Sequence, residues 1–206
     1  MNINWYGQTC FKINSLKAKG ESVNILIDPL EKESGIRGPK NECDLLLLSR
    51  KGFKEKSDCF LISGPGEYDV KGCYVQGIPS HNGKESENTI YTIGTEKMRL
   101  CHLGLLKQKE LDPAQVEAIG EIDILMIPIG GGESLNGREA LKIMTQIEPK
   151  ITIPMYYKIP KLKAKLDSLD SFLKEAGLKN IEPLPKLNIK KKDVPADSAK
   201  IVSLNP

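Results

Sequence analysis

The chain contains two histidines, His81 and His102, which are its clearest candidates for acid–base chemistry. The unperturbed pKa of imidazole, about 6.5, lies close to neutral pH, so a histidine pair in one cleft can both accept and donate protons. A simpler interpretation gives neither residue a chemical role: His102 makes structural hydrogen bonds behind the cleft, and His81 faces solvent. We favour the simpler interpretation and keep both residues as candidates.

Nucleophilic catalysis finds little support in the sequence. No serine lies in the nucleophile-elbow pattern G-x-S-x-G. Cys101 adjoins His102, but successive residues of a strand point to opposite faces of the sheet. A thiolate–imidazole pair between these two neighbours is therefore not expected.

Basic side chains and glycines mark two places where an anion could bind. Arg50, Lys51 and Lys54 form a basic cluster after an apolar run. Gly130-Gly131-Gly132 lies between an expected strand and an expected helix, where backbone N–H groups can hold an anion. It lacks the lysine and the spacing of a P-loop. The plainer interpretations are a solvated charged loop and a structural turn.

Composition and charge exclude several classes of protein. The chain has 206 residues, of which 39% are hydrophobic and 28% are charged, as in ordinary globular proteins. Its net charge of +3 is too small to indicate a nucleic-acid-binding surface. No apolar run approaches the roughly 20 residues that span a bilayer, and the first residues do not resemble a signal peptide. We therefore expect a cytoplasmic protein without a membrane segment.

The cysteines support the same expectation. There are five, an odd number, and no pair has the C-x-x-C spacing of a redox or zinc motif. Most lie inside apolar runs, where a free thiol behaves as a small buried hydrophobic residue. We expect all of them to be reduced: Cys10, Cys43, Cys59, Cys73 and Cys101.

Short strands separated by turn residues are predicted for the first half of the chain. The expected hairpin at the start turns at Gly7-Gln8-Thr9, and the nearly continuous apolar run 43–48 indicates a strand covered on both faces. The expected strands cover residues 3–6, 10–13, 23–27, 43–48, 59–62, 68–70, 73–78, 89–93 and 98–102.

Strands and helices alternate in the second half. Asp112-Pro113 predicts the start of a helix that ends near Gly120, and Asn136 or Gly137 starts another. Strands are expected at 122–127 and 151–155, and a third helix follows from apolar residues at helical spacing between Leu162 and Ala176. Short strands are expected again at 181–184 and 200–204. This order predicts a mixed α/β (α+β) protein with two packed sheets, and no composition break divides residues 1–206.

Several motifs lie in order along nearly the whole chain: residues 4–13 (NWYGQTCFKI), 25–29 (ILIDP), 64–72 (GPGEYDVKG), 88–91 (NTIY), 100–104 (LCHLG), 123–131 (DILMIPIGG) and 147–155 (IEPKITIPM). They resemble motifs of a bacterial group within the metallo-β-lactamase superfamily, the members of which are described broadly as metal-dependent hydrolases. The resemblance implies a single domain with a four-layer αββα sandwich.

The same resemblance implies where metal ligands would lie. In the family, a His-x-His-x-Asp-His motif follows the strand that matches residues 43–48, and two further histidines and a bridging aspartate complete a zinc site. Only His81 keeps a ligand type that the family uses at these positions. Together with His102, these positions would line one region, which we call the relic cleft. Its residues are Arg50, Gly52, Lys54, Glu55, His81, His102, Leu105 and Tyr156. The stretch between Ser49 and Gly64 is short for the family and contains no histidine, so another register does not restore the motif.

Elementary coordination chemistry argues against a metal in this cleft. A catalytic zinc ion needs about three protein ligands with nitrogen, sulfur or oxygen donors, which leucine cannot supply. The cations Arg50 and Lys54 would also repel a divalent ion. We therefore expect no cofactor and regard His81 as a weak metal ligand at best. Asp28 resembles a family aspartate that supports the metal loop, and we expect it to pair with Arg50 or Lys54 instead.

Three functions remain open on these grounds. The leading hypothesis is a pseudoenzyme, a non-hydrolytic homologue that acts as a binding or regulatory module. The second is a phosphodiesterase-type or esterase-type hydrolase with an atypical or single-metal site that uses His81, Glu55, Tyr156 and His102. The third is a module that binds an anion or nucleotide through Arg50 and Lys54. The sequence identifies no partner beyond a small anion or another protein.

Overall fold

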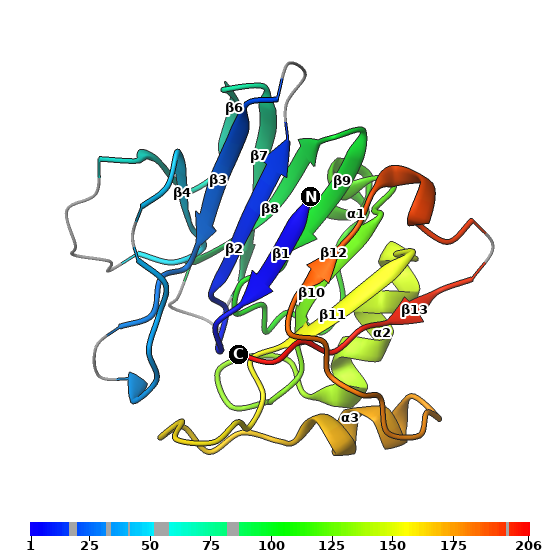
Figure 1. Ribbon diagram of the computed structural model, residues 1–206. Coiled ribbons are helices and arrows are strands. Elements are labelled where there is room, and N and C mark those ends of the chain that lie inside the picture. The colour runs from blue at the N-terminus through cyan, green and yellow to red at the C-terminus, as the bar shows by residue number, and fades with distance from the viewer. Residues whose placement is uncertain (17–19, 32–33, 41, 52–57, 82–86, 197) are drawn as a thin grey trace.

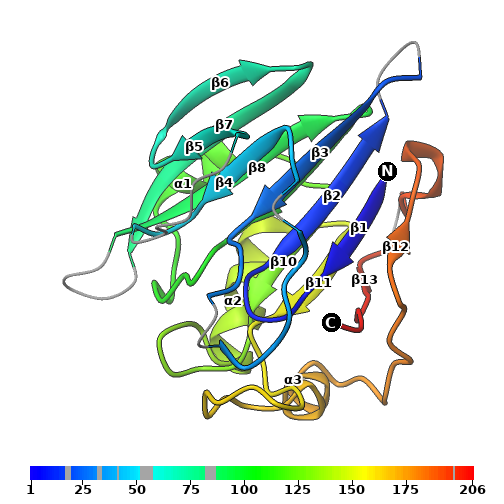
Figure 2. The same cartoon turned by 60° about the vertical axis from the view of Figure 1, so that its left-hand side comes forward.

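Two β-sheets packed face to face form the core of the computed structural model, as Figures 1 and 2 show. The structure describes residues 1–206 except 17–19, 32–33, 41, 52–57, 82–86 and 197. Alternate residues of the strands point into the space between the sheets, and they form a large apolar cluster that includes Trp5, Phe11 and Tyr91. The predicted sandwich of two sheets is confirmed.

The first sheet is built from the N-terminal strands, in the order β12-β1-β2-β3-β4-β5. Strands β1, β2 and β3 are antiparallel, whereas β3, β4 and β5 run parallel to one another. All four residues of β4 are buried, as its uninterrupted leucines predict. The strands are β1 (Asn2–Trp5), β2 (Phe11–Leu16), β3 (Ser22–Ile27), β4 (Leu45–Leu48), β5 (Phe60–Ser63) and β12 (Leu187–Asn188).

The second sheet has the order β13-β11-β10-β9-β8-β7-β6. Strands β9, β10, β11 and β13 are parallel, and β6 to β9 form an antiparallel meander. The strands are β6 (Gly66–Val70), β7 (Cys73–His81), β8 (Glu87–Thr95), β9 (Met98–His102), β10 (Ile124–Pro128), β11 (Ile151–Met155) and β13 (Lys200–Ile201).

The helices begin where their capping residues predict. Asp112 and Asn136 each form a capping box at the start of α1 (Pro113–Ile119) and α2 (Gly137–Ile147). Both helices lie against the outer side of the second sheet, and α3 (Leu169–Glu175) lies beyond the end of β11 (Figures 1 and 2). Within the described part of the chain, no helix packs on the outer face of the first sheet, so the helical layer expected there is not seen.

None of the helices that the described residues form has the length and apolar character needed to cross a membrane.

The third helix is shorter than its apolar spacing predicts. The pattern from Leu162 to Ala176 suggested a helix throughout, but α3 begins after Ser168, whose hydroxyl accepts a hydrogen bond from the Ser171 amide. Residues before it follow an irregular path because the Asp167 amide is bonded to the Gly130 carbonyl. Leu162 and Leu166 pack on the core without a helix. Residues 181–184 likewise form no strand, and β12 was not predicted.

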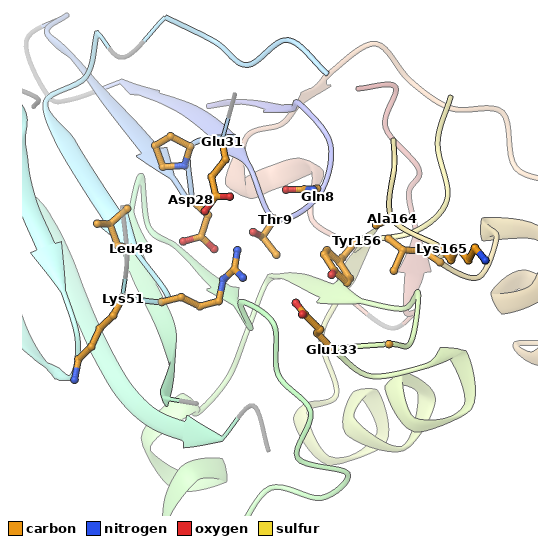
Figure 3. Close-up of a pocket in the computed structure, with 14 residues that line it drawn as sticks. Gln8, Thr9, Asp28, Glu31, Leu48, Lys51, Glu133, Tyr156, Ala164 and Lys165 are labelled. Carbon is orange, nitrogen blue, oxygen red and sulfur yellow. The ribbon is translucent and has the colours of Figure 1, made fainter. Parts of the chain in front are cut away.

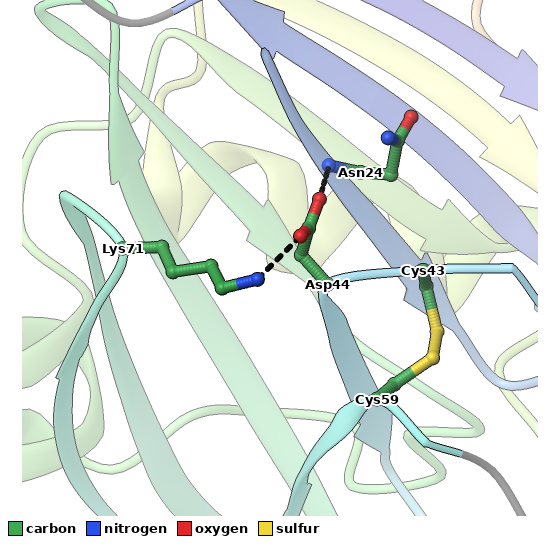
Figure 4. The surroundings of a disulfide bond; sticks show 5 residues. All are labelled: Asn24, Cys43, Asp44, Cys59 and Lys71. Atoms are coloured by element: carbon green, nitrogen blue, oxygen red, sulfur yellow. Dashed lines mark hydrogen bonds and ion pairs between the residues drawn. A yellow bond between two sulfur atoms is a disulfide. The ribbon is translucent and has the colours of Figure 1, made fainter. Parts of the chain in front are cut away.

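The cysteine prediction is wrong for one pair, because Cys43 and Cys59 form a disulfide (Figure 4). Each cysteine lies shortly before one of the neighbouring parallel strands β4 and β5, so their Cα atoms are 5.4 Å apart although 16 positions separate them in sequence. Asp44, between Cys43 and β4, accepts hydrogen bonds from the Asn24 amide (2.8 Å) and the Lys71 ammonium (2.5 Å). The hydrogen bond from the Asn24 amide, and next to it the bond from Lys71, lower the pKa of Asp44 below its ordinary value. Cys10, Cys73 and Cys101 are buried and form no disulfide, as expected.

Reduction of this disulfide is expected to lower the free energy of unfolding by about 3 kcal/mol, because the bond closes a short loop in the unfolded chain. Urea titration with and without dithiothreitol measures the effect. The Cys43→Ser variant is the control, since its unfolding midpoint should already be low and should not change further with reductant. Equal midpoints for the wild-type protein under both conditions would contradict the assignment.

Candidate functional site

A cavity of about 420 Å³ opens at one end of the sandwich (Figure 3). Its walls come from the segments that follow β1, β3, β4, β10 and β11, together with residues that precede α3. The carboxyl ends of neighbouring parallel strands meet at one edge of a sheet, which brings these distant segments together. The lining residues are Gln8, Thr9, Asp28, Pro29, Glu31, Leu48, Arg50, Lys51, Gly132, Glu133, Tyr156, Ala164, Lys165 and Leu166.

Three of these residues have the left-handed backbone conformation that non-glycine residues rarely adopt. Gln8, Asp28 and Tyr156 have φ angles of 48°, 45° and 51°. Each costs on the order of 1 kcal/mol or more, and such strain tends to gather at functional sites. The Tyr156 amide donates to the Gln8 carbonyl (3.1 Å), which links two of the three positions directly. The convergence of this strain on one cavity marks it as the candidate site.

Arg50 stands between this cavity and a smaller one. Its side chain is half-buried and lines both. It makes no hydrogen bond or ion pair with another described residue, so its N–H groups are available to a ligand. Burial raises the pKa of Tyr156; the Glu133 carboxylate adds to this shift and the Arg50 guanidinium opposes it. Arg50 and Glu133 are therefore both within electrostatic reach of the Tyr156 hydroxyl.

Asp28 is held by Ser49, and no cation among the described residues forms an ion pair with it. The Ser49 amide donates to one carboxylate oxygen (2.7 Å) and its hydroxyl to the other (2.6 Å). No ion pair joins Asp28 to Arg50 among the residues that the structure describes, which corrects one of the two expected pairings. Lys54, the other expected partner, lies outside the described residues, as do Gly52 and Glu55.

Buried hydrogen bonds behind the cavity tie the two sheets together. The Thr89 amide donates to the Ser49 carbonyl (2.9 Å), and the Tyr91 hydroxyl donates to the Leu48 carbonyl (2.8 Å). Asn88 donates to the Leu103 carbonyl (3.0 Å) and accepts from the Leu105 amide (2.9 Å). Strand β8 thereby holds the end of β4 on one side and the segment after β9 on the other.

His102 and Leu105 do not line either cavity, contrary to expectation. His102 is fully buried, with Nε2 2.9 Å from the Thr9 carbonyl and Nδ1 3.2 Å from the Gly104 amide. An amide donor at Nδ1 and a carbonyl acceptor at Nε2 fix the neutral tautomer with its proton on Nε2. Burial lowers the pKa of His102, which fits this assignment. Leu105 is also fully buried. His102 is thus the satisfied structural residue of the simpler interpretation.

His81 ends β7 and is exposed, as the same interpretation predicts. It lines a neighbouring cavity of about 250 Å³, to which Arg50, Lys51 and Asn88 also contribute. Lys51 is bound there to Glu87 by an ion pair of 2.5 Å on the protein surface. Arg50 therefore lines one cavity together with His81, whereas Tyr156 does not line that cavity. The residues of the expected relic cleft are thus divided between two cavities.

The described residues do not fit a zinc ion. No group of three His, Cys, Asp or Glu side chains in the described part of the chain could hold a metal. Position 50 carries a guanidinium, position 156 a tyrosine with a raised pKa, and position 105 a buried leucine. Of the expected ligand positions that are described, His81 alone has a suitable donor.

Sequence reasoning missed several residues of the larger cavity. Gln8 and Thr9 were assigned to a hairpin turn, and Glu31, Glu133 and Lys165 were assigned no role. Each lies in a loop, where no periodicity reveals the direction of a side chain. A signal was present for Glu133, because it follows the glycine run after β10 at the edge where parallel strands end.

Comparisons with known proteins identify relatives over most of the chain. Residues 2–156 match the family model of the β-lactamase superfamily domain. A UPF0173 protein of Pyrococcus abyssi is 30% identical over 185 residues, which cover 76% of this chain and 83% of that protein. A UPF0173 metal-dependent hydrolase of Pyrococcus horikoshii is 27% identical over 55% of this chain and 52% of its own. The structure of a proposed Zn-dependent hydrolase of the metallo-β-lactamase superfamily from Thermotoga maritima superposes with a TM-score of 0.80, at 29% identity and 98% coverage of both chains.

Acid is expected to destabilise the protein through His102. Its pKa is lowered on folding, so below the unfolded value of about 6.5 the unfolded chain binds a proton that the folded chain does not. Stability should therefore fall with decreasing pH, by up to about 1.4 kcal/mol per pH unit for this one group. Urea unfolding of the His81→Gln variant between pH 7 and 5.5 isolates the effect, because His102 is then the only histidine. A flat profile would contradict the assignment.

Loss of the Ser49 hydroxyl is expected to cost about 2–3 kcal/mol, because it removes one hydrogen bond from the buried Asp28 carboxylate. Thermal or urea unfolding of Ser49→Ala measures the loss. The matched control is Ser63→Ala on the edge strand β5, where the serine is exposed and little change is expected. Equal effects of the two substitutions would argue against a structural role of the Asp28–Ser49 pair.

Proposed function

Given that the chain belongs to the β-lactamase superfamily, we propose that it is a non-hydrolytic member which binds a small ligand without a metal ion. The observation that carries this proposal is the set of side chains around the cavity. Where the resemblance places metal ligands, the described residues offer a guanidinium at Arg50 and a phenol at Tyr156. Neither is a ligand that zinc uses in proteins of this kind.

The strained residues around the cavity support binding over a purely structural role. Gln8, Asp28 and Tyr156 all adopt a left-handed backbone, and such strain tends to gather at functional sites. The cavity volume of about 420 Å³ lies within the range of small-molecule sites, about 300–1,000 Å³. The whole chain, residues 1–206, acts in this proposal as one domain.

A metal-dependent hydrolase with an atypical or single-metal site is the second candidate. The observation in its favour is the naming of related proteins as metal-dependent hydrolases. In such an enzyme His81 and Tyr156 would have to act together with Glu55, which lies outside the described residues. His102 contributes nothing to it as a proton carrier, because both ring nitrogens are engaged in buried hydrogen bonds.

Metal analysis separates the two candidates. Protein purified without chelator and then dialysed against zinc, manganese or ferrous ions is expected to retain far less than one ion per chain. Its unfolding temperature should be the same with and without EDTA, because no metal contributes to the folded state. Elemental analysis and thermal unfolding provide the readouts.

Activity assays complete this test. Chromogenic phosphodiesters and esters are expected to be hydrolysed no faster with protein than without it, in the presence of each metal. A stoichiometric metal ion, or metal-stimulated hydrolysis that is lost in His81→Ala, would overturn the proposal and establish the hydrolase candidate.

A further inference from the structure

The edge strand β5 is attached to the sandwich by little side-chain packing. It is the last strand of the first sheet, and within the described part of the chain β4 is its only partner strand. Of its four residues, all of which the structure describes, Ile62 alone is buried, whereas Phe60 and Leu61 are 48% and 55% exposed. Because apolar burial is the main force that holds an element in a fold, packing alone attaches β5 weakly.

A covalent bond and a buried hydroxyl fasten β5 at its two ends. Before the strand, the disulfide joins Cys59 to Cys43, which precedes β4 (Figure 4). After the strand, the Tyr91 hydroxyl accepts a hydrogen bond from the Gly64 amide (3.0 Å) and donates one to the Leu48 carbonyl (2.8 Å). Without the disulfide, the start of β5 would depend largely on its backbone pairing with β4.

The far end of β5 forms part of the smaller cavity. Ser63 is the last residue of the strand, and Ser63, Gly64 and Pro65 line the cavity of about 250 Å³ to which His81 also contributes. The disulfide precedes the strand and the cavity wall follows it. A strand of this length spans roughly 13 Å, at about 3.3 Å per residue. A change in attachment at the disulfide therefore reaches the cavity through one short strand.

A reductant can reach this disulfide, whereas the other cysteines are shielded. Cys43 and Cys59 are partly exposed, and thiol–disulfide exchange needs access to one of the two sulfur atoms. Burial raises the pKa of the Cys10 and Cys101 thiols, which keeps them protonated and unreactive. Cys73 is fully buried as well. Exchange is therefore directed to the bond that fastens β5.

Local release of β5 is compatible with a folded sandwich. The large apolar cluster between the sheets includes Ile62 as its only member from β5 among the described residues. A second cluster holds β4 on its other face through Leu26, Leu46 and Leu48, none of which belongs to β5. Elements with few buried contacts open at a lower cost in free energy than the core does.

We propose that the Cys43–Cys59 disulfide is a redox switch for the smaller cavity. In the oxidised protein the bond fixes β5 and the cavity wall that follows it. In the reduced protein β5 detaches locally while both sheets stay folded. This inference goes beyond the proposed function, because it holds whether or not the site binds a metal ion.

The reductant is a dithiol, and the exchange proceeds in two steps. One thiolate of the dithiol attacks the sulfur of Cys43 or Cys59, forms a mixed disulfide and displaces the other cysteine as a thiolate, which takes up a proton. The second thiol of the reductant then attacks the mixed disulfide, releases the remaining cysteine and leaves as an intramolecular disulfide. The protein gains two electrons and two protons, which the dithiol loses.

Hydrogen exchange of the full chain, oxidised or reduced with dithiothreitol at pH 7, tests the proposal. The protected amides of residues 60–63 are expected to exchange roughly tenfold faster or more after reduction, whereas those of β9 and β10 should not change. Iodoacetamide added without denaturant should label Cys43 and Cys59 in the reduced protein and no cysteine in the oxidised one. Re-oxidation with oxidised glutathione should restore slow exchange.

Two variants connect this change to the bond and to the cavity. The double variant Cys43→Ser, Cys59→Ser should exchange rapidly at residues 60–63 with or without dithiothreitol. In nuclear magnetic resonance spectra, the ring signal of His81 should shift on reduction, because His81 shares its cavity with the residues that follow β5. The signal of the buried His102 should stay in place, and His81→Gln assigns the two.

Equal exchange of residues 60–63 in the oxidised and reduced proteins would overturn the proposal, as would a bond that dithiothreitol cannot reduce in the folded protein. Loss of protection throughout both sheets on reduction would also overturn it, because the disulfide would then support the whole fold. An unchanged His81 signal would refute the link to the cavity.

Discussion

Buried hydrogen bonds between the two sheets, at the end where the cavity opens, fix the position of nearly everything else in the site. Ser49 donates hydrogen bonds to both carboxylate oxygens of Asp28, and its carbonyl accepts one from the Thr89 amide, so the ends of β3 and β4 are joined to β8. The hydrogen bonds of Asn88 with Leu103 and Leu105 join the segment after β9 to the same network. Such groups are costly to bury unless every member is paired, which makes the arrangement nearly all-or-none. Arg50 directly follows Ser49 in the chain, so these hydrogen bonds fix the backbone from which the Arg50 side chain extends.

Much of the fold could be predicted from the sequence because its signals are local. Apolar runs predicted the strands, and the capping residues Asp112 and Asn136 predicted where two helices begin. The helix expected from Leu162 was too long because apolar spacing reports burial and not backbone conformation. The disulfide was missed because Cys43 and Cys59 become neighbours only through the pairing of β4 with β5. Contacts between distant segments leave no periodicity in a sequence.

The candidate site was predictable only in part, for a related reason. Family motifs located the loops and identified Arg50 and Tyr156, which do line the cavity. They also suggested His102 and Leu105, which the structure buries, because position along a chain does not reveal which side of a sheet a residue faces at the end of a strand. Glu31 and Glu133, which also line the cavity, belong to no motif. Which loop residues meet around a cavity is a property of the folded molecule.

The left-handed backbone at Tyr156 determines which substitutions this part of the site can accept. Histidine, asparagine and aspartate adopt that conformation more readily than tyrosine does. The main chain here is also closely packed, since a Cβ atom on Gly130 would lie 2.1 Å from the Tyr156 carbonyl oxygen. A side chain at position 130 would therefore displace Tyr156, whereas histidine, asparagine or aspartate at position 156 would suit the existing backbone. The main chain thus permits a change of chemistry at position 156 but not a side chain at position 130.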